Sequence, residues 1–281
     1  MNDAKPFAEW IGRQSESVDY VTERLVASFR AIFEPHLAQV PDGTAPLGIH
    51  WCLSPSIAPM AELGPDGHPA KNRDLPPVPQ PRRMWAGGTV ETLGPLHIGD
   101  RVRRVSTIAD VTGKRGRSGE LWFVAVDHEY MTERGPAIRE RHDIVYREAS
   151  SIVSATKAEE QGPLEHEASQ RWEIDPTPTL LFRYSAITFN GHRIHYDQPY
   201  ATQVEGYEGL VVHGPLQATL LLNLAASDGS TPRRFSYRGL APAFAGNPLF
   251  VCRGGEGRTG ELWTANPYGR VHMKAIIAEA E

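Results

Sequence analysis

The sequence predicts an α+β protein of two similar halves, in each of which an antiparallel sheet wraps around a central helix. The segment Arg-Ser-Gly-Glu-Leu-Trp at 117–122 recurs as Arg-Thr-Gly-Glu-Leu-Trp at 258–263, about half a chain length later. Leucines cover most of the helical circumference of Pro215–Ala226, which is typical of a buried helix. Strand-like segments follow this helix and give it a sheet to pack against. With a length of 281 residues, these features favour two domains in tandem.

The first half opens with a predicted helix and a long loop. Apolar residues four apart predict an amphipathic helix over Val18–Phe33, with Ser17 as its cap. Six prolines mark Gly64–Arg83 as a loop, which is typical either of a lid or binding loop or of a surface excursion. A turn is predicted at Thr112–Gly119. The predicted strands are Val102–Val111, Leu121–Met131, His142–Tyr146, Arg233–Arg238, Leu249–Arg253, Leu262–Asn266 and Arg270–Ala278.

A linker is predicted between the two halves. Residues 151–170 are rich in Glu, Ala, Ser, Lys and Gln and lack periodicity. They separate a predicted N-terminal domain, 1–150, from a predicted C-terminal domain, 171–281. We expect the Val18–Phe33 helix and the proline-rich loop to lie outside the core that the halves share.

Composition excludes several classes of protein. The net charge of −5 argues against nucleic acid as a partner. No apolar run approaches the roughly 20 residues that cross a bilayer. The segment Met1–Trp10 lacks the apolar core of a secretion signal, so we expect a cytoplasmic protein without a membrane partner. Cys52 and Cys252 have no metal-ligand or redox spacing, which predicts no metal and two unpaired structural thiols in a reducing compartment.

The residues suited to catalysis gather in the second half. Asn190 and His195 stand five positions apart, and His213-Gly214-Pro215 opens the buried helix. A neutral imidazole is a natural general base, and an amide can hold a water molecule. Free N–H groups at a helix start can stabilise an oxygen that gathers negative charge. Of eleven histidines, only His195 has Asp or Asn five positions earlier, and the first half has no His-Gly-Pro.

Several neighbouring residues have two interpretations. His192 and His213 suit structural roles as well as catalytic ones. Asp197 can orient an imidazole or cap the next helix. Arg193 can meet a phosphate or carboxylate of a substrate, or form a structural ion pair. The same choice, between coenzyme A phosphates and solvated surface, applies to Arg82, Arg83, Arg233 and Arg234.

These motifs resemble those of MaoC-like enoyl-thioester hydratases, which have the hot-dog fold. The resemblance covers nearly the whole chain and is strongest at Phe182–Phe189 leading into Asn190–Asp197, and at Met84–Gly88 ahead of Pro95-Leu96 and Gly99-Asp100. It is closest to the double hot-dog branch that contains type 2 3-hydroxyacyl-thioester dehydratases and the hydratases of mesaconyl-C4-CoA and itaconyl-CoA. In that branch Asn stands where the wider superfamily has Asp, which leaves the proton donor open, with His195 as both base and acid as one alternative.

The resemblance implies a hydro-lyase of the enoyl-CoA hydratase type. It implies a short, branched C5 dicarboxylic enoyl-CoA as substrate and citramalyl-CoA as product, with the first half helping to bind the acyl-CoA. No cofactor is implied, since coenzyme A is part of the substrate. The oligomeric state stays open, with a homodimer as one form. The implied site residues are Asn190 and His195 for catalysis, Gly214 and His213 at the thioester oxygen, and Arg193, Tyr196 and Arg233 for substrate binding.

Three alternative functions differ in what they require of the site. A hot-dog acyl-CoA thioesterase would direct a carboxylate or an activated water at the thioester carbon. A 3-hydroxyacyl-thioester dehydratase of fatty acid synthesis would use the same residues on longer chains. A non-catalytic acyl-binding module would need no base. Asn190 and His195 followed by His-Gly-Pro disfavour the thioesterase, and the intact His195 disfavours the binding module.

Overall fold

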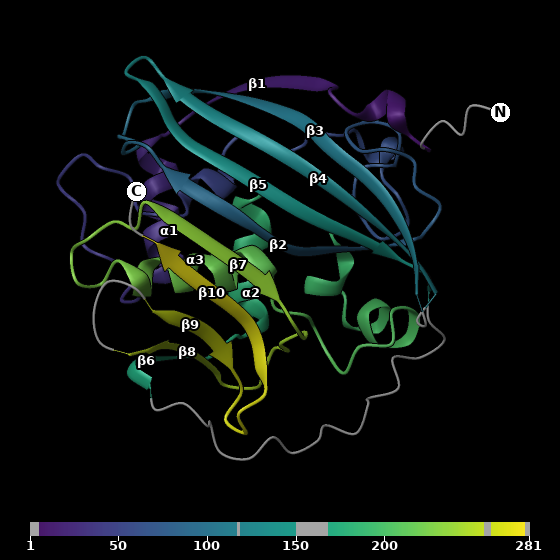
Figure 1. Ribbon diagram of the computed structural model, residues 1–281. Helices are drawn as coiled ribbons and strands as arrows, with labels where there is room; N and C mark the ends of the chain where they lie inside the picture. The colour runs from purple at the N-terminus through teal and green to yellow at the C-terminus, as the bar shows by residue number, and fades with distance from the viewer. Residues whose placement is uncertain (1–5, 117–118, 150–167, 256–259, 279–281) are drawn as a thin grey trace.

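The computed structural model describes residues 6–116, 119–149, 168–255 and 260–278. Within these residues, ten antiparallel strands form one sheet in the order β1-β3-β4-β5-β2-β7-β10-β9-β8-β6 (Figure 1). The strands are β1 Gln14–Tyr20, β2 Arg82–Thr92, β3 Arg101–Gly116, β4 Gly119–Thr132, β5 Gly135–Arg147, β6 Ala168–Ile174, β7 Arg234–Gly239, β8 Leu249–Gly254, β9 Glu261–Ala265 and β10 Val271–Ala278. The helices are α1 Glu23–Phe33, α2 Pro178–Ile187 and α3 Gly214–Ala225, with the short turns η1 Ala8–Trp10, η2 Ile49–Cys52, η3 Met60–Glu62, η4 Arg193–His195 and η5 Tyr200–Val204.

The sheet is built of two matching sets of five strands. β1 to β5 make one half and β6 to β10 the other, and the halves join where β2 pairs with β7, from Gly87↔Arg238 to Glu91↔Arg234. Each half runs in the same order from this junction to its edge. The Gly-Glu-Leu-Trp repeats lie at the starts of β4 and β9, which occupy equivalent places. The repeat therefore marks a structural duplication, as the sequence predicts.

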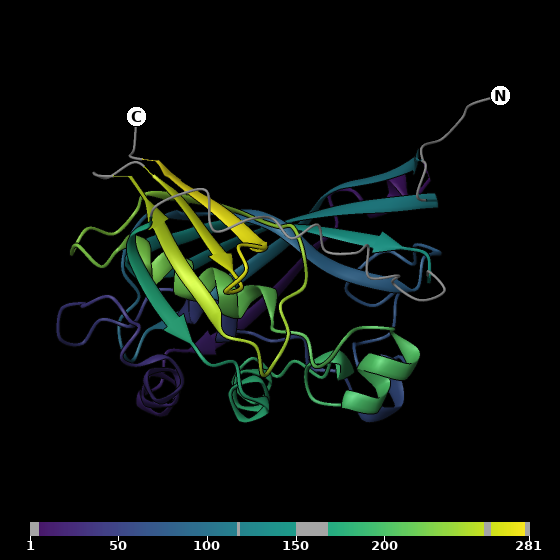
Figure 2. The ribbon, with the colours of Figure 1, turned by 90° about the horizontal axis from the view of Figure 1, so that it is seen from below.

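The central helix of the second half is α3. Every side chain from Leu216 to Ala225 is buried, which confirms the helix predicted over Pro215–Ala226. α3 packs against β7, β8, β9 and β10, and Figure 2 shows these strands curling over it. The largest core cluster contains apolar residues of α1, α2, α3 and both halves of the sheet. The second half thus has the predicted arrangement of a sheet around a helix.

The first half lacks a long central helix among its described residues. Between α1 and β2, the corresponding part of the chain contains only the turns η2 and η3. A proline disfavours the helical conformation of the residue before it, and Ser54 precedes Pro55 at the end of η2. The prediction that each sheet wraps a central helix therefore needs correction here, where η2 stands in place of a helix.

The predicted Val18–Phe33 helix is two elements. Residues 14–20 form edge strand β1, which pairs with β3, and α1 begins only at Glu23. Thr22, not Ser17, is the cap, since its side chain accepts a hydrogen bond from Leu25 N at 3.1 Å. The apolar face of α1 belongs to the main core cluster, so the expectation that this helix lies outside the shared core was wrong.

Other boundaries also differ from the prediction. β3 extends through most of the predicted turn Thr112–Gly119 to Gly116, where it pairs with Gly119 at the start of β4, and residues 117–118 lie outside the described residues. The predicted linker lies mostly outside the described residues, and its last three residues, 168–170, begin β6. The proline-rich segment is a loop as predicted up to Pro81, after which β2 starts.

Two further sequence predictions have structural counterparts. Cys52 and Cys252 are free and buried, as expected of structural thiols. No helix in the described part of the chain is both long and apolar enough to cross a membrane.

Candidate active site

His195 lies in η4, a short turn that follows α2, and its side chain is buried. Its Nδ1 is 2.7 Å from the carbonyl oxygen of Val211. A carbonyl oxygen can only accept, so Nδ1 carries the hydrogen and the neutral ring keeps a lone pair on Nε2. The fold therefore fixes the tautomer in which Nε2 can take a proton.

Burial lowers the pKa of His195 to about 4, although the hydrogen bond to Val211 opposes the shift and the charge of His68 adds to it. Since a base must be neutral to act, kcat/KM should fall only as the pH drops through about 4, not through the ordinary imidazole pKa near 6.5. The same pKa shift makes the stability of the fold depend on pH. In the unfolded chain the imidazole takes up its proton near pH 6.5, and in the folded chain only near pH 4, so the free energy of unfolding should decrease as the pH falls from about 6.5 towards 4. A pH profile of kcat/KM with an acid limb near 6.5 would contradict this environment for His195.

His213 supports the ring of His195 from one side. The two rings stack with centroids 3.6 Å apart and planes 17° from parallel. His213 is fully buried, its Nε2 lies 2.8 Å from Ser185 Oγ, and burial holds its pKa well below the ordinary value. A stacked, uncharged imidazole orients His195 without adding a positive charge beside it.

Gly214 begins α3, directly after His213. The first turn of a helix leaves backbone N–H groups without partners inside the helix. A Cβ atom at Gly214 would come within 2.6 Å of the Trp85 ring, so the glycine is needed for this close packing. Trp85 comes from β2 of the first half, and its Nε1 is a buried donor with no hydrogen-bond partner among the described residues. Both halves thus contribute to the surroundings of this helix start.

Asn190 lies at the end of the α2 segment, where its backbone N–H donates to Ser185 O at 2.8 Å. Its side-chain Oδ1 accepts a hydrogen bond from the backbone N–H of His192 at 3.0 Å. The amide oxygen of Asn190 is therefore used in a hydrogen bond within this turn. The amide nitrogen has no hydrogen bond within the described part of the chain and keeps two hydrogens to donate.

Arg193 contacts both its own loop and the proline-rich loop of the first half. Its guanidinium pairs with Asp197 at 2.8 Å, donates to Pro65 O at 3.0 Å and lies over the Tyr200 ring. Asp197 also accepts from Tyr200 N at 3.1 Å, which confirms its predicted capping role. The Tyr196 hydroxyl donates to Gly191 O at 2.9 Å. Arg193 therefore forms the ion pair that the sequence left as an alternative to substrate binding.

Arg233 lies away from this group. It precedes β7 and donates to Thr92 O at the far end of β2 from Trp85. Six residues of extended strand lie between Trp85 and Thr92, which places these two residues roughly 20 Å apart. Arg233 therefore lies apart from His195, and its assignment to substrate binding stays a prediction. Arg82 is also structural, since it pairs with Glu205 at 3.2 Å.

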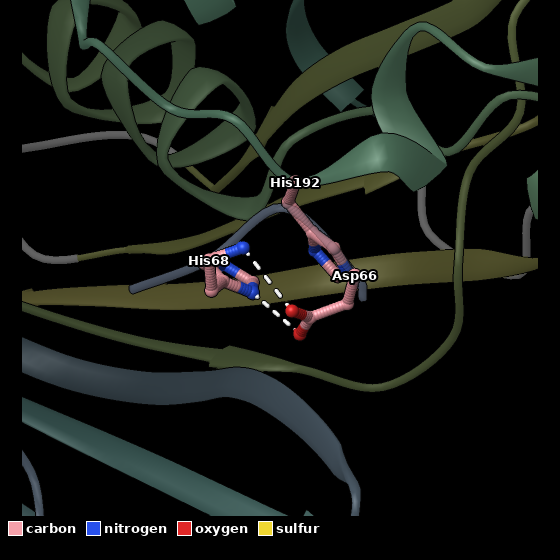
Figure 3. Close-up of side chains that lie close together, drawn as sticks. All are labelled: Asp66, His68 and His192. Carbon is pink, nitrogen blue, oxygen red and sulfur yellow. Dashed lines mark hydrogen bonds and ion pairs between the residues drawn. The ribbon is translucent and has the colours of Figure 1, made fainter. Parts of the chain in front are cut away.

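Sequence reasoning missed Asp66 and His68, which the proline-rich loop brings to the catalytic loop. Asp66 accepts a hydrogen bond from the His68 ring at 2.9 Å, and the His68 and His192 ring centroids are 4.1 Å apart (Figure 3). The backbone N–H of Arg193 donates to Asp66 O at 2.9 Å. The hint in the sequence was the length of the proline-rich loop, for which a lid or binding loop was one of two interpretations.

These three side chains have ligand atoms within 4.8 Å of one another, close enough to be considered for a metal ion. Two features favour a hydrogen-bonded pair instead. The Asp66 carboxylate already accepts from His68. The positive charge of Arg83 acts on Asp66, His68 and His192 and would oppose a second cation.

A glycine holds the proline-rich loop against the catalytic loop. Gly67 has φ +87°, and a Cβ there would overlap the carbonyl oxygen of Gly191. We expect Gly67→Ala to destabilise the fold by about 1–2 kcal/mol through its backbone angle and by about 1–3 kcal/mol more through the overlap. Gly43→Ala is the matched control, because Gly43 has φ +78° but nothing within 4 Å. The midpoint temperature of thermal unfolding and kcat/KM should both fall further in Gly67→Ala than in Gly43→Ala. Equal effects in the two variants would contradict this contact.

Comparison with known proteins places the chain in a family. Residues 48–245 match the family model described as hydroxyacyl-thioester dehydratase type 2. The chain is 41% identical over 270 residues to mesaconyl-C(4)-CoA hydratase of Chloroflexus aurantiacus, covering 95% of this chain and 96% of that protein. Among solved structures it resembles a MaoC-like dehydratase from Phytophthora capsici, at TM-score 0.66, 14% identity and 97% and 98% coverage. It also resembles a Mycobacterium tuberculosis protein with a double hotdog fold, at TM-score 0.55, 12% identity and 95% coverage of both chains. These likenesses confirm the predicted double hot-dog fold.

Proposed function

The chain belongs to the hydroxyacyl-thioester dehydratase type 2 family of MaoC-like hot-dog proteins, and from that premise we propose that it hydrates the double bond of a C5 dicarboxylic enoyl-CoA. The product would be a 3-hydroxyacyl-CoA, with mesaconyl-C4-CoA or itaconyl-CoA as substrate and citramalyl-CoA as product. The observation that carries the proposal is the 41% identity, over nearly the whole chain, to a mesaconyl-C(4)-CoA hydratase.

The arrangement around His195 supports hydration. Hydration needs a base that takes a proton from water as the oxygen bonds to the β-carbon. The neutral ring of His195, with Nδ1 bound to Val211, presents Nε2 for this step. The free amide nitrogen of Asn190 can donate to the attacking water. Its fixed position in the turn with His192 limits the entropy lost in orienting that water.

The start of α3 supports stabilisation of the intermediate. As water adds, negative charge gathers on the thioester oxygen. Backbone N–H groups at Gly214 can donate to that oxygen, and the helix dipole favours negative charge at this end. Arg83 on β2 supplies a cation near the His68 and His192 rings, and it is a candidate partner for the second carboxylate of the substrate.

Two alternatives use different chemistry or different substrates. A thioesterase would need its nucleophile directed at the thioester carbon, and the described contacts of the buried His195 ring include no carboxylate for that purpose. A dehydratase of fatty acid synthesis would share the base but would prefer long chains. We favour the short dicarboxylic substrate because of the hydratase relative.

A panel of enoyl-CoAs tests the substrate class. We expect kcat/KM for a C5 dicarboxylic enoyl-CoA to exceed that for crotonyl-CoA, which lacks the second carboxylate. The excess should be about 10- to 10²-fold, since a hydrogen bond to a charged group contributes about 1.5–3 kcal/mol. A preference for long-chain enoyl-CoA would favour the fatty acid alternative. The panel measures hydration, and the same assay started from citramalyl-CoA measures dehydration, because both directions share the site.

A further inference from the structure

The proposed hydration needs a proton donor that Asn190 cannot be. A carboxylic acid can give up a proton to the α-carbon, whereas a side-chain amide cannot. His195 takes a proton from water in the same reaction, and its Nδ1 hydrogen is bound to Val211. His195 Nε2 would therefore have to make both proton transfers unless a second group that can carry a proton lies close to it.

The structure places one such group beside the catalytic loop. His68 lies next to His192, with ring centroids 4.1 Å apart, and His192 lies next to His195, with centroids 5.4 Å apart. The His68 side chain is 16% exposed, so it lies near the surface of the cluster and can meet a ligand. His68 and His195 are also close enough for the charge of one to act on the other.

His68 has the partner that a proton donor needs. The Asp66 carboxylate lies 2.9 Å from His68 Nδ1 and accepts its hydrogen, which leaves Nε2 to hold the second proton. Three contacts with the main chain of the proline-rich loop hold this pair in place. Arg193 N donates to Asp66 O, Arg193 Nη1 donates to Pro65 O, and Gly67 packs on Gly191. A second-half arginine thus holds a first-half loop in place.

We propose that the Asp66–His68 pair is the proton donor of the hydration reaction, in the role that Asn190 cannot fill. This inference rests on the proposed function, and it assigns a catalytic residue to the half of the chain that lacks the Asn-x4-His motif. Asp66 acts through His68 and is a positioning residue.

The step balances in atoms and charge. With mesaconyl-C4-CoA, whose double bond is conjugated with the thioester, His195 Nε2 takes a proton from water while the oxygen bonds to the β-carbon, and the double-bond electrons move to the α-carbon and thioester oxygen. The protonated His68 ring gives its Nε2 proton to the α-carbon and becomes neutral. After the reaction, His195 holds one extra proton and His68 lacks one. Burial holds the pKa of His192 far below its ordinary value, so His192 cannot carry the proton between them. The proton therefore returns from His195 to His68 through water when the product leaves.

The charged groups around His68 set its proton affinity. Burial lowers the pKa of His68, the charge of Arg83 lowers it further, and Asp66 opposes both. Asp66 itself is influenced by Arg83, and Lys71 lies within range of its charge. A donor must be protonated, so His68 should set a limb on the alkaline side of the pH profile. Removing Asp66 should move that limb to lower pH.

The first test compares His68→Gln with His36→Gln in the full-length protein. His36 is a matched control, since its ring lies 5.3 Å from Trp172 and not in this cluster. We expect His68→Gln to lower kcat by about 10²-fold or more with little change in KM, and to lose the alkaline limb. Asp66→Asn should keep part of the activity with its limb at lower pH. His36→Gln should match the unaltered protein.

The second test separates a proton donor from a structural residue. Asp can carry a proton, so Asn190→Asp should raise kcat by about 10-fold or more in the His68→Gln background, whereas in the unaltered protein it should leave only partial activity. Such non-additivity is expected only if positions 68 and 190 serve the same step. Equal effects of Asn190→Asp in both backgrounds, or a His68→Gln variant within a few-fold of the unaltered protein, would overturn the proposal. So would activity that a chelator removes and a divalent metal restores.

These outcomes are distinct from failure of the proposed function. If the unaltered protein hydrates none of the enoyl-CoAs in the panel, the proposed function fails. If it hydrates one of them and His68→Gln does so equally well, the proposed function stands and the role of His68 is rejected.

Discussion

Replacement of His195 by alanine is expected to lower kcat/KM for hydration by about 10²- to 10⁴-fold, the usual cost of removing a general base. The effect should appear mainly in kcat, because the proton transfer is made in the transition state. The structure gives the reason. His195 Nε2 is the free nitrogen of a ring whose tautomer is fixed by Val211 and whose face is covered by His213. Steady-state kinetics with the preferred enoyl-CoA measure the loss.

His36→Ala is the control for loss of an imidazole elsewhere on the fold. Its ring packs on Trp172 and has no contact with the cluster around His195. Both variants should keep the circular dichroism spectrum of the unaltered protein. Activity of His195→Ala within a few-fold of that of His36→Ala would remove His195 from the mechanism.

Asn190→Ala is expected to lower kcat by about 10²-fold with little change in KM, the cost of a misplaced reactant. Alanine removes both the donor to the attacking water and the acceptor for His192 N–H. Asn190→Asp separates these roles, because a carboxylate keeps the acceptor and cannot donate while ionised. We therefore expect the Asp variant to retain partial activity. Kinetics of both variants over a range of pH measure the two effects.

The Asn190→Asp variant also tests whether position 190 lies close to the imidazole of His195. A carboxylate near His195 would raise the pKa of the imidazole, which burial now holds at about 4. The acid limb of kcat/KM should then move to higher pH. An unchanged acid limb would mean that position 190 is not close to the base, and that Asn190 serves only the turn with His192.

The elements that the sequence predicted well are those with a strong local pattern. α3 is apolar all round because it is buried all round, so its leucines identify it without tertiary information. β4 and β9 were found through the Gly-Glu-Leu-Trp repeat. In contrast, β1 has mostly exposed side chains and depends on main-chain pairing with β3. Such an edge strand leaves no apolar alternation to detect.

The candidate site was predictable only where its residues are close in the sequence. Asn190 and His195 share one loop, and His213 and Gly214 share one helix start, so their spacing carries information. His68 and Trp85 reach the same region from the first half through the fold alone. The position of Arg233 was not predictable for the same reason, because a basic pair in a sequence does not show which end of a strand it occupies.

The most direct test of the central claim, that this chain hydrates a C5 dicarboxylic enoyl-CoA at His195, uses mesaconyl-C4-CoA with two readouts in one reaction. Absorbance of the conjugated thioester reports the double bond, and a thiol reagent reports free coenzyme A. We expect loss of the conjugated absorbance without free thiol, and no such loss with His195→Ala. Release of free thiol in step with the absorbance change, or an unchanged absorbance with the unaltered protein, would contradict it.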